Sequence, residues 1–357
     1  MVAEPVIRVA DLSKTYQEGL LSPKDIQALR GVSFDVFPGE VFGLLGPNGA
    51  GKTTFIKALL GIIRPSGGSA TLLGYDAGDP RGRQKVGYLP ERLVVPRHHT
   101  AYTALEYYGQ LSGMTVPEVR ARQGEVLELV GLADRASDLV RKYSKGMQQR
   151  IGLGQALMHN PDILILDEPT DGLDPVGRAQ VRSILDRLRD EGKTIFLNSH
   201  LLQEVELICD RVAILDRGLL KRVGPVHDMT ASDMQGDGTA ASRPEKPRSA
   251  PTLQVEMELL GAEDAVRAAM GEHILKHWRV VSAGRIRLSA LLPDQPAIDT
   301  CVDALRRGNV SIVSLAPHRA SLEDVFLAAV NDEEATADQA GDQPQSDKTS
   351  KKSGKKK

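Results

Sequence analysis

The chain reads Gly46-Pro47-Asn48-Gly49-Ala50-Gly51-Lys52-Thr53-Thr54 where an apolar run meets a helix-forming run. This order fits G-x-x-x-x-G-K-[ST], a loop whose glycines let backbone N–H groups turn inward around a polyphosphate. We predict a buried strand before the loop, over 41–45, and a helix after it, over 54–60. Strand, loop and helix in this order are the context that the motif requires. The sequence therefore predicts a nucleotide phosphate site, with Lys52 reaching the β- and γ-phosphates and Thr53 ligating Mg²⁺. A chance match by a Gly-rich turn, in a chain with 34 glycines, is the alternative.

Length, net charge and composition limit the classes of protein to which this chain can belong. A length of 357 residues suffices for two domains and a tail, and a net charge of -2 argues against nucleic-acid binding by bulk charge. No apolar run has the length of a transmembrane helix, and the first residues lack the pattern of a signal peptide. Cys209 and Cys301 lack metal-ligand spacing, which favours buried or free thiols in a reducing compartment. We expect a soluble cytoplasmic protein whose membrane role, if any, comes through a partner.

Two further residues are candidates near the nucleotide. Strands with period-two patterns are predicted over 6–9 and 32–36, and Tyr16 lies between them. Its ring could stack on a base or be a half-exposed strand tyrosine. Glu91 follows a predicted strand end over 86–91. Because ligands of open α/β sheets bind at the carboxyl ends of strands, Glu91 is a candidate site residue, with an ordinary loop carboxylate as the alternative.

A change to helical periodicity follows. Helices are predicted over 103–111 and 116–130, and together they indicate a helical insertion into the α/β core. The stretch Tyr143-Ser144-Lys145-Gly146-Met147-Gln148-Gln149-Arg150 ends this insertion. Ser144 can cap the next helix, whose N-terminus would form another anion site. A plain helix cap is the alternative.

Acidic and polar residues follow two later strands. Ile163-Leu164-Ile165-Leu166 is fully apolar, as in a buried parallel strand, and it ends in Asp167 and Glu168. Asp167 is the candidate second Mg²⁺ anchor and Glu168 the candidate general base for a water. His200 ends the predicted strand over 194–200, which has a polar end, and is a candidate γ-phosphate contact. Solvated acids and a structural histidine are the alternatives.

The rest of the chain predicts a second domain. We expect a cassette over 1–230, a flexible linker over 231–251, an accessory domain over 252–330 and a disordered charged tail over 331–357. The accessory domain has a βαββαβ pattern, which suggests a small ferredoxin-like α+β sandwich. It contains no catalytic constellation. Weak attraction of the lysine-rich tail to anionic lipids is an alternative to a plain solvated tail.

Taken in this order, these stretches resemble the ATP-binding subunit of ABC transporters over about residues 5–230. The resemblance matches Tyr16 to the aromatic that stacks on adenine, the phosphate loop to Walker A, and Glu91 to the Q-loop position. The stretch 144–148, from Ser144 through Gln148, falls on the signature motif, and Asp167 with Glu168 falls on Walker B. Gly172-Leu173-Asp174 matches the D-loop, and His200 matches the switch histidine. It implies a P-loop NTPase (RecA-like) core with an antiparallel β subdomain and a helical insertion.

The chain also departs from the family pattern. The signature is usually Leu-Ser-Gly-Gly-Gln, but Lys145 stands where a Gly is usual and Met147 where a Gln is usual. Glu91 likewise stands in place of a Gln, which puts the details of metal binding in doubt. Ser144 and Gly146 remain. This variant, together with Ser321-Leu322-Glu323-Asp324-Val325-Phe326-Leu327 near the end, looks like the multidrug and antibiotic exporter subgroup, whose permease is a separate polypeptide.

The resemblance implies an ATPase that uses ATP and Mg²⁺ and lies at the inner face of the plasma membrane through an integral-membrane permease. It implies a head-to-tail homodimer in which each ATP is held between Walker A of one copy and the signature, with Ser144 and Gly146, of the other. Asp174 is a further candidate nucleotide contact. A soluble ABC ATPase of DNA repair or translation is the competing class, but the chain has one Walker A, no heptads and no cysteine pairs. A non-hydrolysing regulatory module is disfavoured by Glu168 and His200.

Overall fold

A computed structural model describes residues 4–18, 24–230, 253–271, 274–282, 284–317 and 321–331 of the chain. The predicted linker and, beyond residue 331, the predicted tail lie outside the described residues. Within the described part of the chain, no helix is long and apolar enough to cross a membrane.

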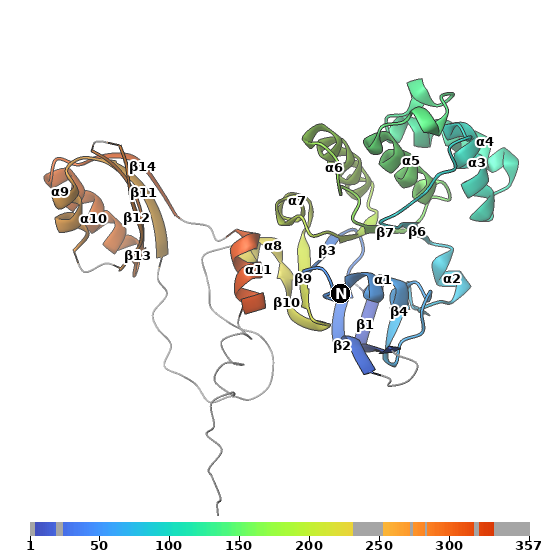
Figure 1. Ribbon diagram of the computed structural model, residues 1–357, viewed down its shortest axis with the longest axis horizontal. Helices are drawn as coiled ribbons and strands as arrows, with labels where there is room; N and C mark the ends of the chain where they lie inside the picture. Colours follow the sequence, from blue (N-terminus) through green and yellow to red (C-terminus); the bar gives the residue numbers. More distant parts are fainter. Residues whose placement is uncertain are drawn as a thin grey trace, which may run out of the picture.

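The first part of the chain is built on a six-stranded sheet in the order β10-β9-β3-β8-β7-β6 (Figure 1). Neighbouring strands from β9 to β6 pair in parallel, and β10 pairs with β9 as an antiparallel hairpin. The bounds are β3 (Val41–Leu45), β6 (Val86–Leu89), β7 (Ile163–Asp167), β8 (Thr194–Asn198), β9 (Arg211–Asp216) and β10 (Leu219–Pro225). As predicted from their unbroken apolar runs, β3, β7 and β8 are buried along their whole length.

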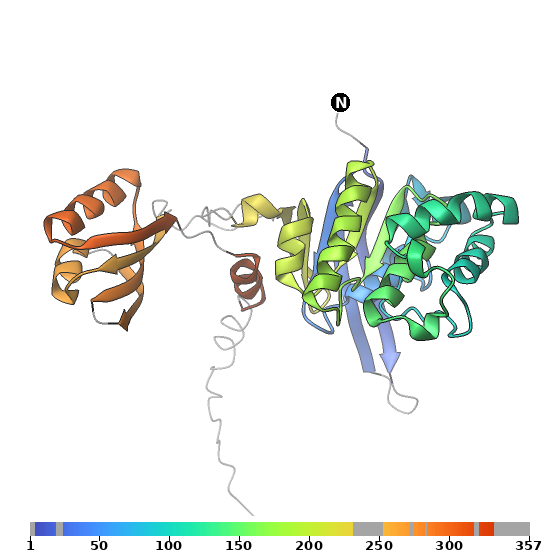
Figure 2. The same cartoon turned by 90° about the horizontal axis from the view of Figure 1, so that it is seen from above.

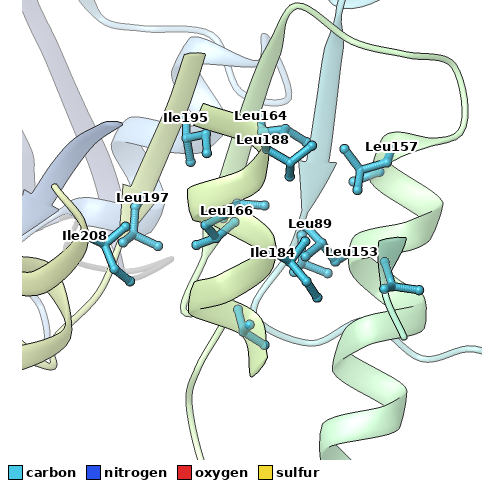
Figure 3. Packing of buried hydrophobic residues seen from close by; sticks show 14 of the residues in the cluster. Leu89, Leu153, Leu157, Leu164, Leu166, Ile184, Leu188, Ile195, Leu197 and Ile208 are labelled. Atoms are coloured by element: carbon cyan, nitrogen blue, oxygen red, sulfur yellow. The ribbon is translucent and has the colours of Figure 1, made fainter. Parts of the chain in front are cut away.

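Alternate residues of these strands pack into two cores, one on each face of the sheet. Leu164 and Leu166 point into one core and Ile163 and Ile165 into the other, as the period-two geometry of a strand requires. On the first face lie α5 (Lys145–Leu157), α6 (Pro175–Asp190) and α7 (Leu202–Ile208), whose leucines and isoleucines interlock with β6, β7 and β8 (Figure 3). The second face is covered by α1 (Lys52–Leu59).

An antiparallel sheet in the order β2-β1-β4-β5 shares the second core. Its strands are β1 (Ile7–Glu18), β2 (Lys24–Val36), β4 (Gly67–Leu72) and β5 (Tyr75–Asp76), and the short α2 (Pro80–Arg83) follows. Four stacked rings, with centroids 5.0 to 6.4 Å apart, join this sheet to α1 and the six-stranded sheet: Phe34, Phe42, Phe55 and Phe196. Together with the six-stranded sheet, this confirms the predicted α/β core with an antiparallel β subdomain.

The predicted helical insertion lies between β6 and β7 (Figure 1). It comprises α3 (Ala101–Leu111), α4 (Val116–Leu129), the 3₁₀ helices η1 (Ala133–Arg135) and η2 (Val140–Lys142), and α5. Thr100 caps α3 with a reciprocal capping box, which fixes where that helix begins. The helices α3, α4 and α5 pack on one another, so α5 links the insertion to the sheet.

A third sheet forms in the second half of the chain, with the order β12-β13-β11-β14 and every pairing antiparallel. The elements are β11 (Leu253–Leu260), α9 (Glu263–Met270), β12 (Ile274–Ser282), β13 (Arg285–Leu292), α10 (Gln295–Arg307) and β14 (Ser311–Pro317). Figure 2 shows both helices on one face of the sheet. This is the topology of the predicted βαββαβ sandwich, and it has a hydrophobic core of its own.

The last helix does not join that sandwich. α11 (Leu322–Asn331) packs on α7, α8 (Val226–Thr230), β9 and β10, as Figure 1 also shows. Its buried residues Leu322, Val325 and Ala329 belong to the cassette core. The range predicted for the accessory domain, 252–330, therefore includes a helix that packs on the cassette. Its capping box is present, since the Asp324 amide donates to Ser321 Oγ at 3.2 Å.

Candidate active site

A cavity of about 460 Å³ opens at the carboxyl ends of the parallel strands. Loops after β3, β6, β7 and β8 meet there, as expected for the ligand-binding edge of an open α/β sheet. Most of its lining was predicted from the sequence: Pro47, Asn48, Gly49, Ala50, Gly51, Lys52, Thr53, Thr54, Glu91, Glu168 and His200. The remaining lining residues are Ala28, Asp171 and Asn198.

The glycines of the loop are required by its shape. Gly51 is the N-cap of α1 and has φ 104°, a left-handed conformation that residues with a Cβ rarely adopt. A Cβ there would collide with the carbonyl oxygen of Ala28, and one at Gly46 would collide with that of Leu215. The loop is thus wedged between β2 and β9, and the start of α1 faces the cavity. A helix N-terminus with free N–H groups is a site for phosphate.

Lys52 is held at the cavity floor by the loop itself. Its ammonium donates to the carbonyl oxygens of Gly46 at 2.6 Å and Pro47 at 3.3 Å. The side chain is buried, and burial lowers the pKa of Lys52, while Glu168 and Asp167 oppose this shift. A cation with few water contacts and acidic neighbours is placed to neutralise a phosphate group.

Glu168 and His200 form a hydrogen-bonded pair at the cavity wall. His200 Nδ1 lies 2.7 Å from Glu168 Oε2, and the His200 amide donates to the same oxygen at 3.3 Å. Burial raises the pKa of Glu168, and His200 and Lys52 partly offset this. A carboxylate with a raised pKa is a stronger base near neutral pH. Chemically, such a pair is able to act as a base, Glu168, and a residue that orients it, His200.

Asp167 lies just behind the lining and is buried. It accepts a hydrogen bond from Asn198 Nδ2, and burial raises its pKa, as does Glu91. Asp167 and Glu168 thus both lie near the Lys52 ammonium. Among the described residues, no cluster of three or more His, Cys, Asp or Glu could hold a metal alone. Mg²⁺ usually takes one or two carboxylates and completes its shell with substrate phosphates and water, and Asp167 and Glu91 are carboxylates near this cavity.

Some predicted residues do not line this cavity. Ser144, Gly146 and Asp174 are absent from its lining. Ser144 is the N-cap of α5, with Oγ accepting from the Met147 amide at 3.2 Å, and Asp174 is the N-cap of α6. Tyr16 lies on β1, 38% exposed, beneath the ammonium of Lys14 rather than in the cavity. Adenine stacking by Tyr16 stays a prediction.

Three lining residues were missed by the sequence analysis. Asn198 lies at the polar end of the same predicted strand as His200. The polar strand end that made His200 a candidate could therefore have identified Asn198 too. Asp171 lies between Walker B and Gly172-Leu173-Asp174, the stretch matched to the D-loop, and the resemblance does not single it out. Ala28 is on β2, and only tertiary packing brings it to the phosphate loop.

Comparison with known proteins bears on this site. The family model described as ABC transporter matches residues 29–171. An uncharacterized ABC transporter ATP-binding protein of Synechocystis is 40% identical over 94% of this chain and 87% of its own length. The linearmycin resistance ATP-binding protein of Bacillus subtilis is 41% identical over 58% of this chain and 68% of its own length. The Nod factor export ATP-binding protein I of Ralstonia nicotianae is 31% identical over 90% of this chain and 93% of its own length.

Solved structures of ABC cassettes resemble the cassette part of this chain. The ATP-binding subunit of an ABC transporter superposes with a TM-score of 0.55 at 31% identity, covering 63% of this chain and 91% of that subunit. A dimeric bacterial ABC transporter cassette gives 0.56 at 25% identity, covering 62% of this chain and 98% of the cassette. None of the relatives and structures named here is described as acting in DNA repair or translation. The chain therefore belongs to the family of ABC transporter ATP-binding proteins.

Proposed function

We propose that this protein hydrolyses ATP at composite sites between two copies of the cassette, and that the ATP cycle drives export through a separate membrane permease. The observation that carries the composite site is the division of the predicted nucleotide contacts into two groups. The phosphate loop, Glu168 and His200 line one cavity, whereas Ser144 and Gly146 do not line it. If both groups contact the same nucleotide, a second copy must supply the second group.

Hydrogen bonds from both copies to one ATP can make dimerisation depend on the nucleotide. In one copy, Lys52 and the amides of the loop supply donors to the phosphates. The facing copy would add Ser144 Oγ and the amides at the start of α5, where Gly146 leaves room. Each charge-assisted hydrogen bond contributes about 1.5–3 kcal/mol. A few such bonds to the γ-phosphate are enough to make association depend on ATP and to end it after hydrolysis.

Within each site the residues have separate roles. Glu168 takes the proton of a water whose oxygen attacks the γ-phosphorus, and the bond from that phosphorus to the ADP oxygen breaks. His200 holds Glu168 in place, and Lys52 stabilises the phosphate charge. Thr53, Asp167 and Glu91 would hold Mg²⁺, which supplies charge neutralisation on the phosphate oxygens when bound.

The direction of transport and the location rest on the relatives. Two of them are named for linearmycin resistance and for Nod factor export. The part of the chain that the structure describes has no helix able to span a membrane. From the family and these relatives, we propose that the protein lies at the cytoplasmic face of the membrane, bound to a permease that carries the cargo site.

Light scattering tests the composite dimer. Glu168→Gln is expected to retain MgATP and to double its mass when ATP is added, because slow hydrolysis leaves the nucleotide in place. Adding Ser144→Arg to Glu168→Gln should abolish the dimer without preventing ATP binding, since Ser144 lies outside the protein's own cavity. A Glu168→Gln protein that retains ATP but stays a single copy would contradict the composite site.

Co-expression with the membrane protein encoded beside this gene tests the permease. The two are expected to elute together in detergent, and the permease should change the rate of ATP turnover. Lys52→Ala should leave the complex intact while removing turnover. A membrane protein that elutes separately, or one whose presence leaves turnover unchanged, would count against transport coupling.

A further inference from the structure

Lys145 is an unexpected residue at the start of α5. It directly follows the N-cap Ser144 and lies in the first turn, where the helix dipole disfavours a cation. It also stands at a signature position where the family usually has glycine. A residue that is unfavourable for its own helix calls for a compensating contact elsewhere.

The compensating contact is in the loop that follows the catalytic acids. Lys145 Nζ lies 3.7 Å from Asp171 Oδ2. The lysine side chain crosses over Gly172, and a Cβ at that position would collide with its ammonium. Gly172 has φ +62°, a backbone conformation that residues with a Cβ rarely adopt, and the lysine ammonium lies directly over this glycine.

Asp171 connects that ion pair to the catalytic pair. Its other oxygen, Oδ1, lies 4.0 Å from His200 Nε2, while His200 Nδ1 lies 2.7 Å from Glu168 Oε2. Two carboxylates thus flank one imidazole, one beside each ring nitrogen. Asp171 also lines the nucleotide cavity. Lys145 is the cation on the outer carboxylate.

We propose that Lys145 is a positioning residue, which neutralises and holds Asp171 so that His200 stays on Glu168. This inference rests on the proposed function, because it concerns turnover at the same site. Without Lys145, the Asp171 carboxylate competes with Glu168 for the imidazole and leaves an uncompensated negative charge at the cavity wall. In a chain with glycine at position 145, that restraint would be missing.

The size of the effect follows from exposure. The Lys145 and Asp171 side chains are 60% and 52% exposed, so solvent screens their ion pair and keeps its effect small. Lys145→Gln in the full chain is therefore expected to lower kcat by up to about fivefold, the equivalent of about 1 kcal/mol. The KM for ATP should change by less than about twofold because the Lys52 cradle is intact. Lys145→Arg should keep the wild-type kcat, since it preserves the cation.

A double-mutant cycle with Asp171→Asn tests the link. In the Asp171→Asn background, Lys145→Gln is expected to change kcat by less than about 1.5-fold, because the carboxylate that it restrains is gone. Arg187→Gln is the matched control. Arg187 pairs with Glu191 at 3.6 Å on α6 and is 63% exposed, so its loss should leave kcat unchanged. Thermal unfolding checks that each variant is folded.

Separate measurements test the proposed function and the role of Lys145. Turnover by the wild type and its loss in Glu168→Gln report on the proposed function, whereas the cycle reports on the Lys145 link alone. Wild-type kcat in Lys145→Gln would overturn the proposal. So would an equal loss with and without Asp171, or a loss confined to KM, because Lys145 would then contact the nucleotide of a facing copy instead.

Discussion

Glu168 shows what single residues contribute to this site. It has φ 53°, a left-handed conformation that is rare for a residue with a side chain, and its amide donates to the Asn198 carbonyl at 2.9 Å. Strained backbone of this kind persists where surrounding contacts fix it and is frequent in active sites. Here the turn directs the carboxylate to His200 and into the cavity rather than along β7.

His159 gives the cassette a pH dependence of its own. The residue follows α5, and its Nε2 lies 3.1 Å from the Val86 carbonyl oxygen on β6. Burial, with the nearby cations Arg122 and Lys193, lowers the pKa of His159 from its ordinary 6.5. Since the unfolded chain then binds the proton more readily, the folded state loses stability as the pH falls below about 6.5.

Urea unfolding of the full chain at pH 7.5 and pH 5.5 checks this. The wild type is expected to lose more stability between the two values than His159→Gln, whose amide can still donate to Val86 but does not titrate. The carboxyl groups that titrate in the same range are common to both proteins. Equal losses in wild type and variant would mean that His159 has no part in the pH dependence.

The sequence predicts most of the site at this scale because motif residues follow the strand ends directly. Lys52, Glu168 and His200 were placed by that rule, and the structure brings all three to one cavity. Asp171 and Ala28 could not be placed in the same way. Their positions depend on how a turn folds back and how β2 packs on the loop, which local periodicity does not encode.

Among the elements, α11 shows where sequence patterns stop being informative. A capping box and apolar spacing predict that the helix exists, but they do not say what it packs on. In the structure its apolar face completes the cassette core against α7 and α8, and its first amide, at Leu322, donates to Glu206 Oε2 on α7 at 3.4 Å. α7 begins two residues after His200. Packing of α11 therefore supports the helix next to the catalytic pair.

Two leucines of α11 give a matched test. Leu322 is fully buried and Leu327 is 48% exposed. Leu322→Ala is expected to destabilise the cassette by about 2–5 kcal/mol, because it removes packed atoms and leaves a cavity. Leu327→Ala should cost less than about 0.5 kcal/mol, as is usual for surface positions.

Two probes identify which core is affected. Trp278 is the single tryptophan and lies on β12, so its fluorescence follows the accessory domain. Release of a fluorescent ATP analogue follows the cassette. Leu322→Ala should lower the cassette transition and leave the Trp278 transition unchanged. A shift in Trp278 alone would assign α11 to the accessory domain instead.

On the scale of the whole molecule, the chain leaves the cassette after α8 and returns to it at α11. The accessory sheet lies between these two helices in sequence, and α8 and α11 are in contact. The accessory domain is thus joined to the cassette at both of its ends. We propose that it stabilises or regulates the assembly, since no catalytic group among its described residues reaches the nucleotide cavity.

Deletion tests this connection. Replacing residues 231–320 with a Gly/Ser linker that joins Thr230 to Ser321 is expected to leave a folded cassette that binds ATP, because α11 still covers its core. Ending the chain at Thr230 uncovers the apolar side chains of α7 and α8 and should lower the thermal midpoint or cause aggregation. A midpoint for the shorter chain equal to that of the linked chain would contradict a role for α11 in the cassette.

ATP turnover and nucleotide retention by the full-length Glu168→Gln protein test the central claim most directly. If Glu168 is the base of the cavity, the variant retains ATP while hydrolysis falls by about 10²-fold or more. Lys52→Ala is the control that should lose the nucleotide itself, because the phosphate cradle then lacks its cation. Turnover by Glu168→Gln at the wild-type rate would contradict the account.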